Sequence, residues 1–193
     1  LIKEGEGADL KAQSWTANGD ITLNIDEFQV KTNTEISFTN NHDIYGSDTY
    51  TISGGSVNLE KLGFPGSGNA SLTNIVLSKP PESTSDQQIL EIKEWTGTGQ
   101  LKFNTAGISV NSEASINYQL DPVTRKKEIY TISSASLGSE IFGETKVTAS
   151  NIVLTKEDST KEFKLESWSA TGKVSKTIGN NININSNATV NYK

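Results

Sequence analysis

The sequence predicts an all-β protein, a folded-over β-sheet of the jellyroll or sandwich-like type built from five alternating repeat units in the order A-B-A-B-A. Apolar and polar residues alternate with a period of two, and Thr, Val, Ile and aromatic residues are enriched in the alternating segments. These segments recur along the chain in a fixed order. No window has the periodicity of an amphipathic helix. We therefore expect a single all-β repeat domain over residues 1–193.

Unit A is marked by a tryptophan that stands four residues before a glycine. It occurs three times, at about residues 10–40, 90–119 and 163–193, and its markers are Trp15, Trp95 and Trp168. In the first copy the alternation predicts one strand from Trp15 to Ile25 and a second from Phe28 to Phe38, joined by a turn.

The long strands of unit A are predicted to bend. Small residues such as Ala17 and Gly19 occupy the middle of the apolar face, and glycine within a strand often marks a bend or a bulge. Ahead of each tryptophan the apolar alternation changes phase, for example between Ile92 and Trp95. The pattern predicts a bulge or a change of face just before the tryptophan.

Unit B, at about residues 48–79 and 128–156, lies between the copies of unit A. Its first mark is Tyr-Thr-Ile-Ser, beginning at Tyr50 and again at Tyr130, and its second is Asn-Ile-Val-Leu, beginning at Asn74 and again at Asn151. The spacing from Trp to Tyr is 35 residues in both A-to-B steps. Because the repeat continues beyond the polar, proline-containing segment 80–86, we interpret that segment as a long loop rather than a domain boundary.

Composition excludes several classes of protein. A net charge of −6 and a pI near 4.9 do not supply the basic field that nucleic-acid binding requires. No apolar run approaches the roughly 20 residues of a transmembrane helix. Cysteine and methionine are absent, which excludes disulfides, thiolate metal sites and a cysteine nucleophile. Since the sequence opens with Leu1 rather than Met, we expect a processed protein that is secreted, extracellular or at the cell surface.

No residue set indicates catalysis or a bound cofactor. His42, the single histidine, stands beside Asp43 in a predicted polar turn, where a solvated side chain is expected rather than a general base. The 23 acidic residues are scattered without a repeated motif, so no pair of glycosidase-type carboxylates is assigned. The sequence therefore predicts a non-catalytic protein, with no catalytic, cofactor-binding or metal-ligating residue assigned.

Calcium is a weaker alternative. Asp43 with Asp48, or Glu157 with Asp158, could supply the oxygen ligands that this ion prefers. Neither pair belongs to an EF-hand loop or a glycine-rich calcium repeat. Charged turns of this kind are usually solvated.

Glycan is a second weaker alternative. Asn69 and Asn187 open Asn-Ala-Ser and Asn-Ala-Thr triplets, which match the acceptor pattern for N-glycosylation. The three tryptophans could also form a carbohydrate-binding platform, although their fixed place in the repeat favours packing.

The last double unit has a rhythm of small and apolar positions at Gly143 to Val147, Ala149, Ile152, Leu154, Gly172-Lys173-Val174, Ile184, Ala188 and Tyr192. This spacing resembles the OstA-type repeats of the lipopolysaccharide-transport proteins LptA and LptC. The resemblance implies a folded-over β-jellyroll with an apolar interior and open ends, able to stack end to end and to carry acyl chains. Under it the interior is lined by Ile21, Leu23, Phe28, Leu101, Phe103, Ile108, Ile182 and Ile184.

Unit A stands at both ends of the repeat without an evident cap, and Val190 to Lys193 still follow the strand pattern. Uncapped repeats expose an apolar face or an unpaired strand edge. The leading hypothesis is therefore a secreted structural protein that assembles head to tail through its terminal β-edges into a homo-polymer, either an extracellular fibre or a surface layer. The alternatives are a periplasmic lipid carrier or bridge of the lipopolysaccharide-transport type and a carbohydrate-binding adhesin, so lipid and glycan remain candidate partners.

Overall fold

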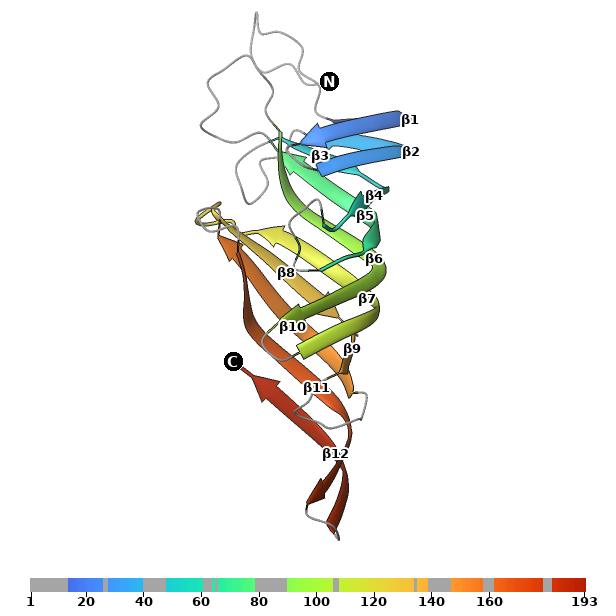
Figure 1. Ribbon diagram of the computed structural model, residues 1–193. Helices are drawn as coiled ribbons and strands as arrows, with labels where there is room; N and C mark the ends of the chain where they lie inside the picture. The colour runs from blue at the N-terminus through green and yellow to red at the C-terminus, as the bar shows by residue number, and fades with distance from the viewer. Residues whose placement is uncertain are drawn as a thin grey trace, which may run out of the picture.

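The computed structural model describes residues 14–25, 28–39, 48–60, 64, 66–78, 90–105, 108–133, 135–138, 147–157, 162–178 and 182–193. In these ranges every regular element is a β-strand, and all of them belong to one antiparallel sheet of twelve strands (Figure 1). The predicted all-β class is confirmed.

The strands are, in chain order, β1 (Ser14–Ile25), β2 (Phe28–Thr39), β3 (Thr49–Ile52), β4 (Gly55–Asn58), β5 (Asn69–Ser78), β6 (Glu91–Thr105), β7 (Ile108–Leu120), β8 (Lys127–Ser133), β9 (Ala135–Gly138), β10 (Val147–Glu157), β11 (Phe163–Ile178) and β12 (Ile182–Tyr192).

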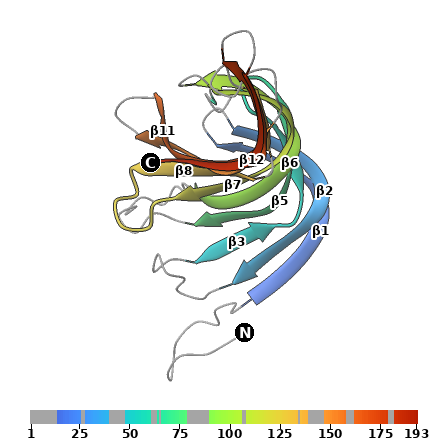
Figure 2. The same cartoon turned by 90° about the horizontal axis from the view of Figure 1, so that it is seen from below.

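The sheet runs in the spatial order β1-β2-β3-β5-β6-β7-β8-β10-β11-β12, with the short strands β4 and β9 added beside this path. It twists continuously from the β1 end to the β12 end (Figure 1), and viewed along that direction it curls into a trough (Figure 2). The sheet does not close, because β1 and β12 stand at its two ends and are not paired with each other. The folded-over, sandwich-like architecture predicted from the sequence is therefore confirmed in the form of an open, curled sheet.

Three long hairpins form the frame of the sheet: β1–β2, β6–β7 and β11–β12. The two strands of the first hairpin begin and end within a residue of the sequence prediction, and Ile25 pairs with Phe28 across the turn. Thr, Val and Ile favour these strands because branched side chains pack well on a pleated surface.

Bulges interrupt the pairing where the sequence changes phase. The β5–β6 register shifts once at Asn74 and Ile75 and again at Lys93, two residues before Trp95. Asn74 adopts a φ of 53°, a left-handed conformation that asparagine tolerates better than most residues. The β10–β11 pair shifts in the same way around Asn151, whose φ is 55°. The bulges expected just before Trp95 and Trp168 are thus present, each together with a second one in the neighbouring strand, while the residues ahead of Ser14, where the third was expected, lie outside the described ranges.

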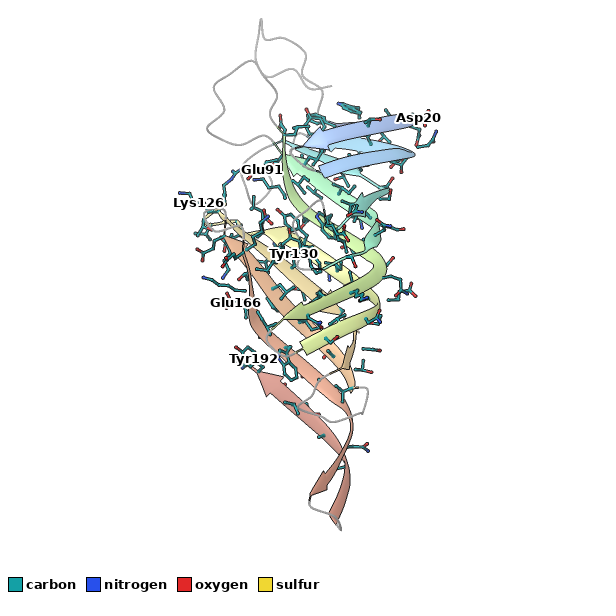
Figure 3. All side chains as sticks on the ribbon, viewed as in Figure 1. Asp20, Glu91, Lys126, Tyr130, Glu166 and Tyr192 are labelled. Carbon is teal, nitrogen blue, oxygen red and sulfur yellow. The ribbon has the colours of Figure 1, made fainter. Side chains whose placement is uncertain are left out.

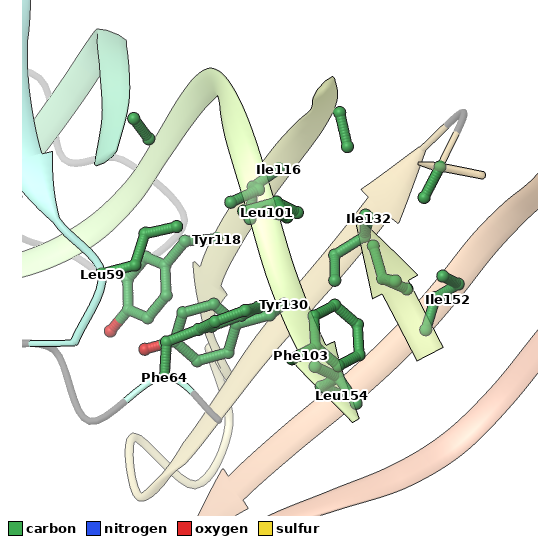
Figure 4. Close-up of a cluster of buried hydrophobic side chains, with 14 of the residues drawn as sticks. Leu59, Phe64, Leu101, Phe103, Ile116, Tyr118, Tyr130, Ile132, Ile152 and Leu154 are labelled. Carbon is green, nitrogen blue, oxygen red and sulfur yellow. The ribbon is translucent and has the colours of Figure 1, made fainter. Parts of the chain in front are cut away.

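The core lies on the concave face of the trough (Figure 4). Ile116, Ile132 and Ile152 stand opposite one another on β7, β8 and β10, and each is fully buried. The bend in β6 brings Phe103, near the hairpin turn, over this same face, where it is buried with them. Gly99 makes room for the adjacent strand, because a Cβ atom there would lie 2.9 Å from the Cα of Ala70.

Candidate functional site at the two sheet edges

A row of large side chains crosses the concave face from the β1 edge to β6 in the middle of the sheet. It begins with Trp15 on β1, which pairs with Phe38 on β2, and Phe38 in turn pairs with Tyr50 on β3. Leu77 and Ile92 continue the row on β5 and β6. The Trp15 ring stacks on the Phe38 ring at a centroid distance of 5.8 Å, and the Phe38 ring lies 5.0 Å from that of Tyr50. Aromatic pairs of this kind contribute about 0.5–1.5 kcal/mol beyond their buried area.

The same order of side chains returns in the middle of the sheet. Trp95, Tyr118 and Tyr130 occupy β6, β7 and β8, and Leu154 and Leu165 follow on β10 and β11. The rings of Trp95 and Tyr118 are stacked at 5.6 Å, and those of Tyr118 and Tyr130 lie 5.1 Å apart. Trp15 and Trp95 thus each start a row that passes through two further rings before it reaches leucine.

The third row has only two members among the described residues. Trp168 on β11 stacks on Tyr192 of β12 at 6.3 Å, with the ring planes 10° apart. The sheet ends at β12, so no strand supplies the tyrosine that Tyr50 and Tyr130 provide in the other rows. As a result Tyr192 is 45% exposed, whereas its counterpart Tyr118 is buried.

The β1 edge is incomplete in a complementary way. Trp95 and Trp168 are 3% and 6% exposed because β5 and β10 cover them, but Trp15 is 42% exposed since no described strand precedes β1. Added Cβ atoms at Gly99 and Gly172 would strike the neighbouring strand, yet one at Gly19 would find nothing within 4 Å. The β1 edge therefore has the shape of a position from which one strand is missing.

Both edge strands are long and nearly free of charge. β12 contains no charged residue over its 11 positions, and β1 contains only Asp20, which accepts a hydrogen bond from Asn33. The central strand β6, by contrast, carries Glu91, Lys93, Glu94 and Lys102. Proteins that must remain monomeric usually protect their edge strands with lysine, proline, bulges or short length. In this protein the central strand β6 carries four charged residues, whereas the two edge strands carry one between them.

The trough is filled in its middle by a residue from the segment between β4 and β5. Phe64 is buried, and its ring lies 5.6 Å from Phe103 on β6, 5.9 Å from Tyr130 on β8 and 5.6 Å from Phe163 on β11. Its amide N–H donates to the carbonyl of Leu59 at 3.1 Å, which helps to hold Phe64 at this place. Phe64 thus packs between the β6–β7 hairpin on one side and strands β8 and β11 on the other.

An ionic cluster stands at the rim of the trough. Lys93 is fully buried and its Nζ lies 2.5 Å from a carboxylate oxygen of Glu91; the guanidinium of Arg125 approaches the same oxygen at 2.5 Å. Burial works to raise the pKa of Glu91, but the hydrogen bonds and positive charges of these two partners outweigh it and hold the pKa below its usual value.

The turn between β7 and β8 places Arg125 in this cluster. The Asp121 carboxylate accepts hydrogen bonds from the backbone N–H groups of Thr124 and Val123, at 2.8 and 2.9 Å, and these bonds lower its pKa. Arg125 follows with a φ of 53°, a left-handed conformation that closes the turn. The cluster ties β6 to the β7–β8 turn, and its chemistry is structural.

Tyr130 is a buried titratable group in the middle row. Its hydroxyl donates to a carboxylate oxygen of Glu128 at 2.7 Å. Burial first, and then the nearby negative charge of Glu128, raise the pKa of Tyr130 well above its usual value. This residue is enclosed among aromatic rings in the core, so we assign it a packing role.

A polar hollow of about 300 Å³ lies beside the β5 bulge. It is lined by Asn74, Glu94, Trp95, Thr96, Asn117, Tyr118 and Gln119. The Thr96 hydroxyl donates to the side-chain oxygen of Asn117 at 3.0 Å, so two of the polar groups that line the hollow already bond to each other. The tryptophan ring stacks on Tyr118 and is buried, so it offers no open platform at this place.

The remaining sequence candidates are dispersed. His42, Asp43 and Asp158 fall outside the described residues, while Asp48 and Glu157 lie at separate strand ends. In the described part of the chain no three acidic or histidine side chains gather where a metal ion could bind. Asn69 and Asn187, the glycosylation candidates, are both exposed.

The interior positions implied by the family resemblance are only partly described. Leu101 and Phe103 are buried in the core. The side chains of the other six lie outside the description: Ile21, Leu23, Phe28, Ile108, Ile182 and Ile184.

Sequence reasoning missed Phe64 and Lys93. The first stands in a Gly/Pro-rich segment that suggested only a loop, and the second is a charged residue on a strand predicted to be amphipathic. A signal for Phe64 does exist: phenylalanine is usually buried, so a single phenylalanine in a Gly/Pro-rich segment indicates a side chain that packs against the fold.

No helix that could cross a membrane occurs in the described ranges. The chain matches no protein-family model, no curated protein and no solved structure.

Proposed function

We propose that this protein is a non-catalytic structural subunit that assembles head to tail into a fibre or surface layer outside the cytoplasm. In this proposal β12 of one copy pairs with β1 of the next. The observation that carries it is the pair of long, almost uncharged edge strands, each of which presents an aromatic ring without a covering strand. Because the two edges differ from each other, contact between them leaves a free edge at either end and the chain of subunits continues.

The energetics of such a junction are favourable. A β-sheet hydrogen bond contributes about 1 kcal/mol net, and association costs roughly 4–15 kcal/mol of lost freedom. Hydrogen bonds along the 11 residues of β12 are thus of the same order as that cost. Burial of Trp15 and Tyr192, which are both about half exposed in the single copy, adds a hydrophobic contribution that favours association.

The middle of the molecule supports a structural role more than transport. The space between the β6–β7 hairpin and the strands β8 and β11 is occupied by the rings of Phe64, Phe103 and Phe163. A subunit that transmits mechanical load benefits from a packed interior, whereas a carrier of acyl chains needs a continuous free groove.

A second candidate function is a lipid-carrying bridge, and one observation favours it. The sheet is open, and the exposed rings of Trp15 and Tyr192 stand on its concave face at the two ends. Stacked copies would join these surfaces into one apolar strip along the assembly. Mass spectrometry of an organic extract separates the two proposals, because a carrier retains acyl lipid in stoichiometric amount and a structural subunit does not.

Negative-stain electron microscopy tests assembly itself. We expect linear particles whose length increases with protein concentration. Val190→Lys should shorten or abolish them, since an inward-pointing lysine on an edge strand prevents pairing. Val123→Lys, on the exposed turn between β7 and β8, is the matched control and should leave the particles unchanged. Single particles of one copy at every concentration would contradict the proposal.

A further inference from the structure

We propose that the junction has one register, in which Tyr192 of one copy stands opposite Trp15 of the next. This inference rests on the proposed head-to-tail assembly and specifies its partner as a second copy of the same chain. In this register residues 182–192 run antiparallel to residues 15–25, so every residue of β12 gains a partner on β1.

The direction of the strands permits this pairing. Neighbouring strands on the path from β1 to β12 are antiparallel at every step, and the path contains ten strands. The first and last therefore run in opposite directions, and β1 of a following copy, placed next to β12, continues the antiparallel order. The two ends also lie far apart, as the positions of Asp20 and Tyr192 in Figure 3 show, so the contact joins two copies rather than the edges of one.

The free backbone groups of the two edges also match. Trp15 pairs with Phe38, and Trp168 pairs with Tyr192, at corresponding places in two hairpins. In antiparallel pairs both residues direct their N–H and C=O groups toward each other, or both direct them away. We take the two corresponding pairs to be of the same type. The free N–H and C=O groups along the outer edges of β1 and β12 then alternate in the same order when they are counted from Trp15 and from Tyr192. The proposed register aligns these groups along the whole junction.

The small side chains fit in the same register. Within the chain, Ala70 faces Gly99 and Leu72 faces Gly97 on the neighbouring strand. At the junction Ala188 would face Gly19. The open space at Gly19 accepts the methyl group of Ala188, since nothing lies within 4 Å of a Cβ position there.

The next pair repeats this agreement. Val190 would face Ala17, an apolar side chain opposite a small one, as Leu72 faces Gly97 inside the chain. β12 would thus offer β1 the kind of surface that β5 offers β6. The register reproduces an internal contact of the protein at the boundary between two copies.

Other registers lose these agreements. A shift of one residue turns the apolar face of β12 outward. A shift of two residues in one direction leaves Trp15 beyond the end of β12, and in the other direction it places Val190 opposite Trp15 and leaves Tyr192 beyond the start of β1. The proposed register covers both rings and forms a continuous row from Trp168 through Tyr192 and Trp15 to Phe38.

The outer face is compatible as well. Asp20 is the one charged residue of β1, and it would stand opposite Asn187. An amide can donate a hydrogen bond to the carboxylate, so the junction places no like charges together.

Disulfide cross-linking between two single-cysteine variants tests the register. The protein has no cysteine of its own, so any cross-link reports the introduced pair. Asn18→Cys mixed with Thr189→Cys places the cysteines directly opposite each other, on exposed outer-face positions. The Cα atoms of opposite residues on antiparallel strands lie about 4.5–5.5 Å apart, which is within the Cα range of a disulfide. The Cα atoms of positions two residues away lie at about 7–8 Å, which is beyond that range.

The matched controls pair Asn18→Cys with Asn187→Cys or with Asn191→Cys, which shift the second cysteine by two residues. We expect the directly opposed mixture to form covalent dimers on a non-reducing gel at least several-fold faster than either control. A second directly opposed mixture, Thr16→Cys with Asn191→Cys, should do the same if one substitution disturbs the edge.

Two failures are distinguishable by sedimentation of the same mixtures before oxidation. If the proteins assemble but a shifted pair cross-links fastest, the register is wrong and the head-to-tail proposal stands. If every mixture sediments as single copies and none cross-links, both the register and the assembly are refuted.

Discussion

Replacement of Phe64 by alanine measures how far the fold depends on the filling of the trough. The side chain is buried against Phe103, Tyr130 and Phe163. Core Phe→Ala substitutions cost about 3–5 kcal/mol. Because Phe64 lies outside the strands, where surrounding side chains can close part of the cavity, we expect a loss near the lower limit, about 3 kcal/mol. For a domain of this size each kcal/mol lowers Tm by about 2–4 °C, so Tm should fall by about 6–12 °C.

Differential scanning calorimetry of Phe64→Ala, with Phe64→Leu and Val123→Ala as controls, provides the measurement. The leucine variant keeps most of the volume and should lose less than half as much stability. Val123 is 87% exposed, so its truncation should change the free energy of unfolding by no more than about 0.5 kcal/mol. A loss below about 1 kcal/mol for Phe64→Ala would mean that the interior is not closed by this ring, and the argument for a packed interior would fail.

Three further predictions follow from the described contacts. Because folding lowers the pKa of Glu91, its carboxylate stabilises the folded state above the ordinary pKa of 4.5, and this stabilisation is lost as the pH falls through the lowered pKa. Glu91→Gln should therefore reduce the loss of stability at acid pH in a stability–pH curve. An unchanged acid limb would contradict the assignment. Gly99→Val should lower Tm because the valine side chain would strike the backbone of Asn69 and Ala70. Gly19→Val should leave the Tm of the single copy within a few degrees but weaken assembly, since the space beside Gly19 is open. Equal losses of Tm in the two variants would refute the open edge. In a spectrophotometric titration one tyrosine should stay protonated beyond the pH of about 10 at which tyrosine ordinarily ionises, and Tyr130→Phe should remove that late step.

The strands of the long hairpins could be predicted from the sequence because alternation with period two is a local property. The pairing of Trp15 to Ile25 with Phe28 to Phe38 agrees with the predicted bounds. The bulge before Trp95 was also readable, since a change of apolar phase within one strand requires an extra residue. The short strands β4 and β9 were not predicted, because four residues carry too little periodicity to separate a strand from a loop.

Contacts made by the folding of the sheet over itself could not be predicted in this way. Phe64 is buried by residues 39 and 99 positions away in the chain, Phe103 and Phe163, and nothing local marks that destination. Lys93 is buried because a bulge turns it toward Glu91 and the β7–β8 turn supplies Arg125. Such positions depend on tertiary geometry rather than on propensity.

The candidate site was foreseen only as a principle. Unit A at both ends predicted two unpaired edges, and the described sheet has β1 and β12 at its ends. The exposure of Trp15 and Tyr192 and the open space at Gly19 required the cross-strand neighbours of each residue. Sequence spacing identifies corresponding residues, but only the structure says which of them lack a neighbour.

A mixture of two variants, each blocked at a different edge, tests head-to-tail assembly most directly. Ala17→Lys disables β1 and leaves β12 free, and Val190→Lys does the reverse. In sedimentation velocity each variant alone should remain a single copy, and their equimolar mixture should form a species of two copies and no larger one. Wild-type protein that stays single at high concentration, or a variant that dimerises by itself, would contradict the pairing of β12 with β1.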